Sequence, residues 1–351
     1  MFYNAAGCRL SMSIFGSIKK RTTRLKPFKF QKVGLHFYDM KALECKNICK
    51  QFGKKIALNN LTLDLEEGRI LGVLGPNGSG KTTFIRIIMN LLMQDSGKIL
   101  VFGKDPRALE NNYVSYLPEE RGIYIKHDIW RYVKYIAQIK GLSGNNLYDE
   151  ITRLTEELKF ELPSSGTINT LSKGNQQKLQ ILISLLGNPK MTILDEPFSG
   201  LDPQSRSEVN KAIKKLSDNG STIIIATHML DQAESLCSDV LLIRNGVNVC
   251  SGSMSEIKKT HSSDHFLVGS LSNSKLSEFE NHQVKVEYQK IKPPYNSMYS
   301  IRPIGNVTRH EIMNYLHSEN FEIDYFEKDC PSLEEIYLES VSKEENEKHK
   351  E

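Results

Sequence analysis

The feature that most constrains this sequence is a Gly-x-x-x-x-Gly-Lys-Thr motif between a short apolar strand, expected over Ile70–Leu74, and an apolar helix starting near Thr82. Glycines let successive backbone N–H groups turn toward phosphates, and the helix adds the positive end of its dipole. A glycine-rich turn without a ligand is the alternative, but the flanking strand and helix favour a nucleotide site in an α/β fold. The residues expected to bind nucleotide here are Gly75, Pro76, Asn77, Gly78, Ser79, Gly80, Lys81, Thr82 and Thr83.

Two adjacent carboxylates, Asp195 and Glu196, follow a second apolar strand, expected over Met191–Leu194. At a strand tip beside the phosphate loop, Asp195 can hold Mg²⁺ together with the Thr82 hydroxyl. Glu196 is then the candidate general base that polarises the attacking water. Strand alternation points the two side chains in different directions, so two roles are favoured over one shared site. The alternative is a solvated strand end.

Composition indicates an ordinary soluble globular protein, with 39% hydrophobic and 25% charged residues. Six scattered cysteines include only one close pair, Cys45 and Cys49, and no second pair with zinc spacing. Reduced thiols in a cytosolic compartment are therefore expected. No apolar run approaches the roughly 18 residues that suggest a membrane span. If the protein serves transport, another chain must supply the pore.

The basic segment 1–39 carries eight Lys/Arg and one acidic residue, although the whole chain has a net charge of only +4. It lacks a convincing signal peptide. The favoured interpretation is a disordered extension, or a start codon assigned too early. Contact with anionic lipid headgroups or with nucleic acid remains the alternative.

Residues 40–250 have an α/β pattern, with a further buried strand expected at Thr222–Ala226, and 105–187 contain a helical insertion. Helical periodicity within that insertion is clearest over 129–140 and 147–159. Residues 251–341 change character and predict the order β-α-β-β-α-β, typical of a small ferredoxin-like α+β domain. Its strands are expected at 266–268, 284–288, 298–303 and 321–326, and its helices at 275–280 and after a Thr308–Glu311 capping box. Residues 342–351 form a charged tail.

Five motifs in order make the sequence resemble the ABC transporter ATP-binding subunits over about residues 41–250. Besides the phosphate loop and the Asp195-Glu196 strand, Leu171–Gln177 resembles the ABC signature, Ser199–Asp202 the D-loop, and His228 the switch histidine. Phe52 stands where the family stacks an aromatic ring on adenine, with a core position as the alternative. The resemblance implies a P-loop NTPase cassette, with a RecA-like core and a helical subdomain.

The same resemblance implies a site that two cassettes share. Ser172 and Gly174 would complete the ATP site of the opposite subunit, Asp202 would couple the two sites, and His228 would bind the γ-phosphate. The expected cofactors are ATP and Mg²⁺, the expected activity is ATP hydrolysis driven by dimerisation, and a homodimer is the favoured pairing.

Departures from the family pattern point to a subgroup. Lys173 and Asn175 replace two signature residues, and Glu119 stands at the Q-loop position, where the resemblance assigns it to Mg²⁺ and transport coupling. These features, with Pro331–Tyr337 near the end, resemble exporter ATPases paired with ABC-2-type permeases, including sodium-extruding systems. The resemblance therefore implies a cytoplasmic subunit, peripheral on the inner membrane face, with no nucleic acid expected.

Two other functions compete with this interpretation. A ribosome- or nucleic-acid-directed ABC ATPase would use the basic segment, but such proteins carry two cassettes in a chain and this sequence has one. A nucleotide-binding protein without turnover is disfavoured by Glu196 and His228. The transported substrate does not follow from the sequence.

Overall fold

A computed structural model of the chain describes residues 41–348, apart from gaps at 111–112, 121, 123, 262–264, 273, 277–278, 281–283, 290–293 and 305–306. The basic segment 1–39 and its expected properties lie outside the described residues. Cys45, Cys49, Cys237, Cys250 and Cys330 are free thiols, as expected. None of the helices in the described part of the chain combines the length and apolarity that crossing a bilayer requires.

The central sheet has the strand order β5-β6-β7-β3-β8-β9, with only β9 antiparallel to its neighbour among these pairs. Every residue of β3, β6 and β7 is buried, which explains their uninterrupted apolar sequences. All three predicted core strands are confirmed. The strands are β3 (Ile70–Leu74), β5 (Val114–Leu117), β6 (Met191–Asp195), β7 (Thr222–Thr227), β8 (Asp239–Arg244) and β9 (Val247–Ser253).

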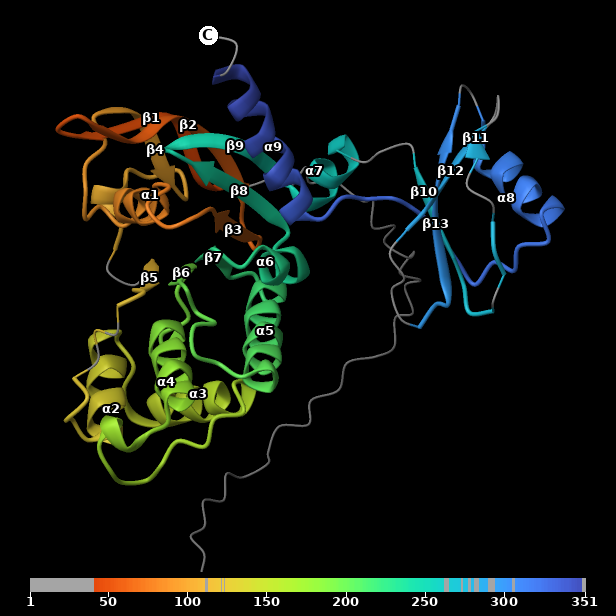
Figure 1. The fold of residues 1–351 in the computed structure, drawn as a ribbon. Coiled ribbons are helices and arrows are strands. Elements are labelled where there is room, and N and C mark those ends of the chain that lie inside the picture. The colour runs from red at the N-terminus through yellow and green to blue at the C-terminus, as the bar shows by residue number, and fades with distance from the viewer. Residues whose placement is uncertain are drawn as a thin grey trace, which may run out of the picture. The chain divides into compact units, whose positions relative to one another are not determined.

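A second sheet, antiparallel and ordered β2-β1-β4, packs with the central sheet around helix α1. Phe84, Ile85 and Ile88 of α1 share one hydrophobic cluster with side chains from both sheets. The ribbon shows α1 beside the sheet of β1, β2 and β4 (Figure 1). This packing holds the N-terminus of α1 near the C-terminal end of β3, with only the loop 75–80 between them. The elements are β1 (Lys41–Phe52), β2 (Lys55–Glu66), β4 (Ser96–Val101) and α1 (Lys81–Ile88).

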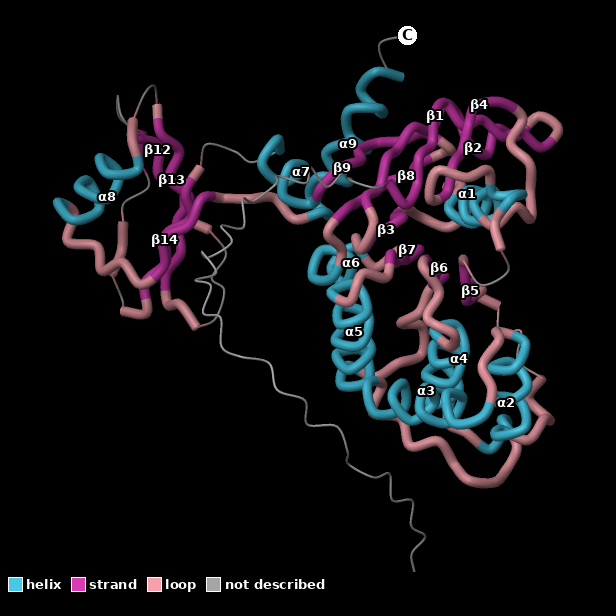
Figure 2. The backbone as a smooth tube through the Cα atoms, turned by 180° about the vertical axis from the view of Figure 1, so that it is seen from behind, coloured by secondary structure: helices cyan, strands magenta, loops and turns pink. Residues whose placement is uncertain are grey.

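The helical insertion forms a group of helices at one end of the cassette, as both views show (Figures 1 and 2). The predicted helices are confirmed, although the second begins earlier than its periodicity indicated, at Gly144. Asp128 caps the first by accepting a hydrogen bond from the Arg131 N–H. The elements of the insertion are η1 (Pro106–Ala108), α2 (Ile129–Ile139), α3 (Gly144–Glu157), η2 (Ile168–Thr170) and α4 (Lys173–Leu185), whereas α5 (Pro203–Asp218) follows β6 outside it.

The C-terminal domain is an antiparallel sheet of order β11-β12-β13-β10-β14 with helix α8 packed on it through Ile312 and Leu316. The order of its longer strands, β12-β13-β10-β14, is that of a ferredoxin-like fold. The Thr308–Glu311 capping box is confirmed. The elements are β10 (Phe266–Ser270), β11 (Phe279–Glu280), β12 (Val284–Tyr288), β13 (Ser297–Pro303), α8 (Arg309–Ser318) and β14 (Tyr325–Lys328).

Two predictions for this domain are wrong. The described residues of the segment 275–280 do not form the expected helix, because Phe279 and Glu280 pair with β12 as a short strand. Tertiary pairing of this kind overrides the helical propensity of a short segment. The last strand lies later than expected, and Phe321 instead packs in the core beside α8.

Three further helices pack against the hydrophobic cluster that contains Leu242 of β8: α6 (Leu230–Leu236), α7 (Met254–His261) and α9 (Leu333–Lys348). Leu333 and Ile336 of α9 belong to the same hydrophobic cluster as Ile257 of α7 and Ala233 of α6. In chain order, the sheet of the C-terminal domain (the accessory sheet, β10–β14) therefore lies between α7 and α9, which both pack on the cassette.

Candidate nucleotide-binding site

The loop between β3 and α1 approaches other backbone very closely at two glycines. Gly75 has a φ of 144°, and a Cβ there would lie 2.1 Å from the Ile243 carbonyl oxygen. Gly80 has a φ of 120°, and its Cβ would lie 2.5 Å from the Ala57 carbonyl oxygen. Only glycine fits either position. No side chain caps α1, so the backbone N–H groups of its first turn are free to donate to an anion.

Lys81, the first residue of α1, is held against this loop. Its Nζ donates to the carbonyl oxygens of Gly75, at 2.7 Å, and Pro76, at 3.1 Å. Burial lowers the pKa of Lys81, while the negative charges of nearby carboxylates oppose that shift. An incoming phosphate can replace these two neutral acceptors.

Asp195 ends β6 and is 2% exposed. The Tyr116 hydroxyl of the neighbouring strand β5 donates to its Oδ2 at 3.4 Å. Burial, followed by the charges of Glu119 and Glu196, raises the pKa of Asp195 to about 6. A carboxylate that is desolvated and surrounded by like charges is stabilised by a bound cation.

Glu196 turns away from the strand direction, with a φ of 48° that is unusual for a residue other than glycine. Its Oε1 accepts from the His228 backbone N–H at 3.0 Å and lies 2.7 Å from His228 Nδ1. Its Oε2 accepts from the Thr227 hydroxyl at 3.0 Å. The two carboxylates at the end of β6 thus contact different partners, and Glu196 is hydrogen-bonded to the end of β7.

A cavity of about 380 Å³ brings most of the predicted residues together. Phe52 lies in its wall and is 49% exposed, so it is not a core residue. The lining residues are Phe52, Lys55, Ala57, Asn77, Gly78, Gly80, Lys81, Thr82, Thr83, Glu119, Asp195 and Glu196. Its size is within the range of small-ligand sites.

Three predicted residues, Ser172, Gly174 and Asp202, lie in a different part of the molecule, at the starts of α4 and α5. Ser172 caps α4 by accepting from the Asn175 N–H at 3.2 Å, with Gly174 in the first turn. Asp202 caps α5 and accepts from Ser205 N–H and Oγ, and these hydrogen bonds lower the pKa of Asp202. None of these three lines the 380 Å³ cavity. Ser79 is 3% exposed, and its hydroxyl has no hydrogen-bond partner within the described residues.

A second cavity, of about 330 Å³, is lined by Gly75, Pro76 and His228 together with Asn77. The sequence did not predict three residues at the nucleotide site: Lys55 and Ala57, which line the 380 Å³ cavity, and Tyr116, which contacts Asp195. Lys55 pairs with Phe52 across the β1–β2 hairpin, and this proximity was the one local signal that could have identified it. Tyr116 reaches Asp195 through the β5–β6 pairing, which joins segments far apart in the chain.

The phosphate loop, the paired carboxylates and the parallel sheet together define a P-loop ATPase. Comparisons give the family. The ABC transporter family matches residues 58–199, and the family described as "ATP-binding protein DrrA1-3-like, C-terminal domain" matches residues 252–341. The chain belongs to the ABC transporter ATP-binding proteins.

Whole-length relatives support this assignment. The chain is 31% identical over 299 residues to the ABC transporter ATP-binding protein YhaQ of Bacillus subtilis, covering 85% of this chain and 98% of YhaQ. It is 32% identical to an ABC transporter ATP-binding protein of Alkalihalophilus pseudofirmus, covering 77% of this chain and 98% of the relative.

Solved structures support the same family assignment. An ATP-binding subunit of an ABC transporter matches with a TM-score of 0.57 and 26% identity, covering 62% of this chain and 92% of that one. A nucleotide-free ATP-binding cassette matches with a TM-score of 0.53 and 26% identity, covering 63% and 94%. This chain is therefore the ATP-binding, ATP-hydrolysing subunit of an ABC transporter, with a DrrA-like C-terminal domain.

Proposed function

We propose that two copies of this chain close on two ATP molecules and that the closure powers an exporter. The observation that carries this proposal is the separation of the anion-binding groups. Ser172 and Gly174 stand at the start of α4, outside the cavity lined by Lys81. A second copy, placed head to tail, would bring its signature helix to this cavity and complete the site.

Within the cavity, each group has a part suited to its chemistry. The free N–H groups of α1 and the Lys81 ammonium bind the β- and γ-phosphates, and Thr83 supports the α-phosphate. The exposed ring of Phe52 stacks on adenine. The opposite copy supplies Ser172 and Gly174 to the γ-phosphate, and its Asp202 lies at the interface and couples the two sites.

The residues fit a Mg²⁺ ion that is held jointly with the nucleotide. Thr82, Asp195 and Glu119 line the cavity and offer the oxygen donors that Mg²⁺ prefers. The described residues contain no cluster of three or more His, Cys, Asp or Glu that could hold a metal by themselves. Phosphate oxygens would therefore complete the coordination, and the bound ion would neutralise phosphate charge during hydrolysis.

Glu196 and His228 then organise the attacking water. Glu196 accepts its proton as the water oxygen bonds to the γ-phosphorus and the bond to the β-phosphate oxygen breaks. His228 holds the γ-phosphate and, through Nδ1, the Glu196 carboxylate. The hydrogen bonds from Thr227 and His228 fix that carboxylate before ATP arrives.

Glu196→Gln tests the base assignment, because the amide keeps the shape but cannot take a proton. We expect turnover to fall by about 100-fold or more while ATP affinity is retained. Phosphate release and calorimetry measure the two quantities. The matched control is Glu67→Gln, an exposed residue between β2 and β3. Unchanged turnover in Glu196→Gln would refute the assignment.

Within the exporters, we place this chain in the subgroup paired with ABC-2-type permeases, including sodium-extruding systems. The DrrA-like match over residues 252–341 supports that subgroup. The cassette would lie on the cytoplasmic face of the membrane, with its surface near Glu119 and Tyr124 receiving a cytoplasmic helix of the permease. Tyr124 is 69% and Ile125 49% exposed there, which suits docking of an apolar helix face.

Extraction of membranes with detergent tests this partner. Co-purification of a multi-span protein with the chain is the expected result. A chain that purifies alone with full ATPase activity contradicts it, and sodium efflux from vesicles that contain the complex tests the sodium-extruding assignment.

A further inference from the structure

The C-terminal helix α9 packs on the catalytic cassette. Leu333 is 1% and Ile336 2% exposed, and both lie in the cluster that contains Leu242 of β8 and Ala233 of α6. The segment Pro331–Tyr337 is therefore the point where the chain returns from the accessory sheet to the core of the ATPase. The proposed hydrolysis reaction assigns no role to this segment.

One carboxylate of α6 joins the three helices of this region. Glu234 Oε2 accepts from the backbone N–H of Leu333, the first residue of α9, at 2.9 Å. Its Oε1 pairs with Lys258 of α7 at 2.5 Å. α6 has only seven residues and buries only Ala233 fully, so its position depends on these neighbours.

The start of α6 is in turn bonded to the proposed catalytic carboxylate. The Met229 N–H, just before α6, donates to the Thr227 hydroxyl at 3.1 Å. That hydroxyl donates to Glu196, and His228 between them contacts Glu196 through its backbone and its ring. A shift of α6 would therefore move both His228 and the partners of Glu196.

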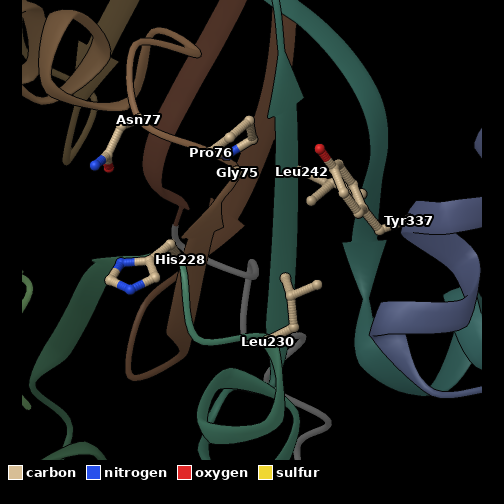
Figure 3. A pocket seen from close by; sticks show the side chains of 7 residues that line it. All are labelled: Gly75, Pro76, Asn77, His228, Leu230, Leu242 and Tyr337. Carbon is tan, nitrogen blue, oxygen red and sulfur yellow. The ribbon is translucent and has the colours of Figure 1, made fainter. Parts of the chain in front are cut away.

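Tyr337 is the α9 residue that lines a cavity together with His228. It lines a cavity of about 330 Å³ together with Pro76 and Asn77 of the phosphate loop, His228, and Leu230 at the start of α6. Figure 3 shows the Tyr337 ring beside Leu242, on the α9 side of the cavity, with Pro76 and His228 forming other parts of the wall.

We propose that Tyr337 is a positioning residue for ATP hydrolysis, which acts by holding the start of α6 and thereby His228 in the arrangement that turnover requires. Its ring packs on the cluster beneath α6, while the Glu234–Leu333 bond fixes the other end of the contact. No residue of α9 lines the 380 Å³ cavity, so we expect the loss of Tyr337 to reduce turnover more than ATP affinity. This inference rests on the proposed roles of Glu196 and His228.

Tyr337→Ala in the full-length chain tests the proposal. A displacement of catalytic groups by a fraction of an ångström reduces rates steeply, so we expect kcat to fall about tenfold while the Kd for ATP stays within about twofold. Tyr337→Phe, which keeps the ring, should retain wild-type kcat. Leu338→Ala, 54% exposed on the same helix, is the control. Thermal unfolding of each variant verifies the fold.

A His228→Ala background separates positioning from general destabilisation. If Tyr337 acts through His228, Tyr337→Ala has no further effect on kcat in that background. Additive losses, an unchanged kcat in folded Tyr337→Ala, or a parallel loss of ATP affinity would each overturn the proposal. If Tyr337→Ala does not fold, Glu234→Gln must give the same selective fall in kcat.

Failure of this inference is distinguishable from failure of the proposed reaction. If Glu196→Gln abolishes turnover and Tyr337→Ala does not alter it, only the inference is wrong. If Glu196→Gln turns over normally, the catalytic assignments are wrong, and the positioning role fails with them.

Discussion

At the scale of single residues, the site contrasts two adjacent carboxylates in different surroundings. Asp195 is buried near other negative groups, with one weak hydrogen bond from Tyr116. Glu196 accepts three contacts from Thr227 and His228. The first environment suits a group that awaits a cation, and the second suits a group that must be held in one orientation.

Asp195 gives a pH-dependent prediction for the nucleotide-free protein. Its pKa is raised from 3.8 to about 6 on folding, so the folded state disfavours the ionised form and loses stability as pH rises through that window. Asp195→Asn should therefore raise the free energy of unfolding at pH 8, by up to about 3 kcal/mol. The gain should shrink at pH 5.

Chemical denaturation in the presence of a chelator measures that difference. Glu67→Gln, which neutralises an exposed carboxylate, is the control. An equal effect of Asp195→Asn at both pH values is the outcome that contradicts the burial argument.

At the scale of elements, the termini of helices carry the chemistry. α1 leaves its first N–H groups uncapped beside the cavity, whereas α4 is capped by Ser172 and α5 by Asp202. The Ser172 hydroxyl accepts from Asn175 in the free chain and, in our proposal, also faces the γ-phosphate held by the opposite copy.

Ser172→Asp separates these two functions of the signature helix. Aspartate is as good a helix cap as serine, so the melting temperature should stay close to that of the wild type. The added negative charge would repel the γ-phosphate, and turnover should fall by about tenfold or more. Ser143→Asp, at the exposed N-cap of α3, is the matched control. A Ser172→Asp variant with full turnover would exclude the helix from the ATP site.

At the scale of the whole molecule, local sequence patterns predicted those elements whose apolar residues are also the buried ones. The fully apolar strands β3 and β6 and the glycines at Gly75 and Gly80 are examples, because each is constrained within a few residues. Contacts between distant segments could not be predicted in this way. Tyr116 meets Asp195 through strand pairing, and Tyr337 reaches the phosphate loop after the chain has formed another domain.

The left-handed backbone of Glu196 was equally hidden, since nothing in the adjacent residues requires it. The helix predicted over 275–280 was wrong for the same reason, because the strand formed by Phe279 and Glu280 depends on pairing with the distant residues of β12. Element type was thus predictable where local period and burial agree, and unpredictable where a remote partner decides.

The central claim is that a second copy completes the ATP site. The direct measurement is the molar mass of Glu196→Gln, by light scattering, with and without ATP. We expect a species at the 40.0 kDa mass of one chain without ATP and at twice that mass with it. This shift should be lost in a Glu196→Gln, Ser172→Asp double variant. A 40.0 kDa species that binds ATP fully and stays a monomer would contradict the account.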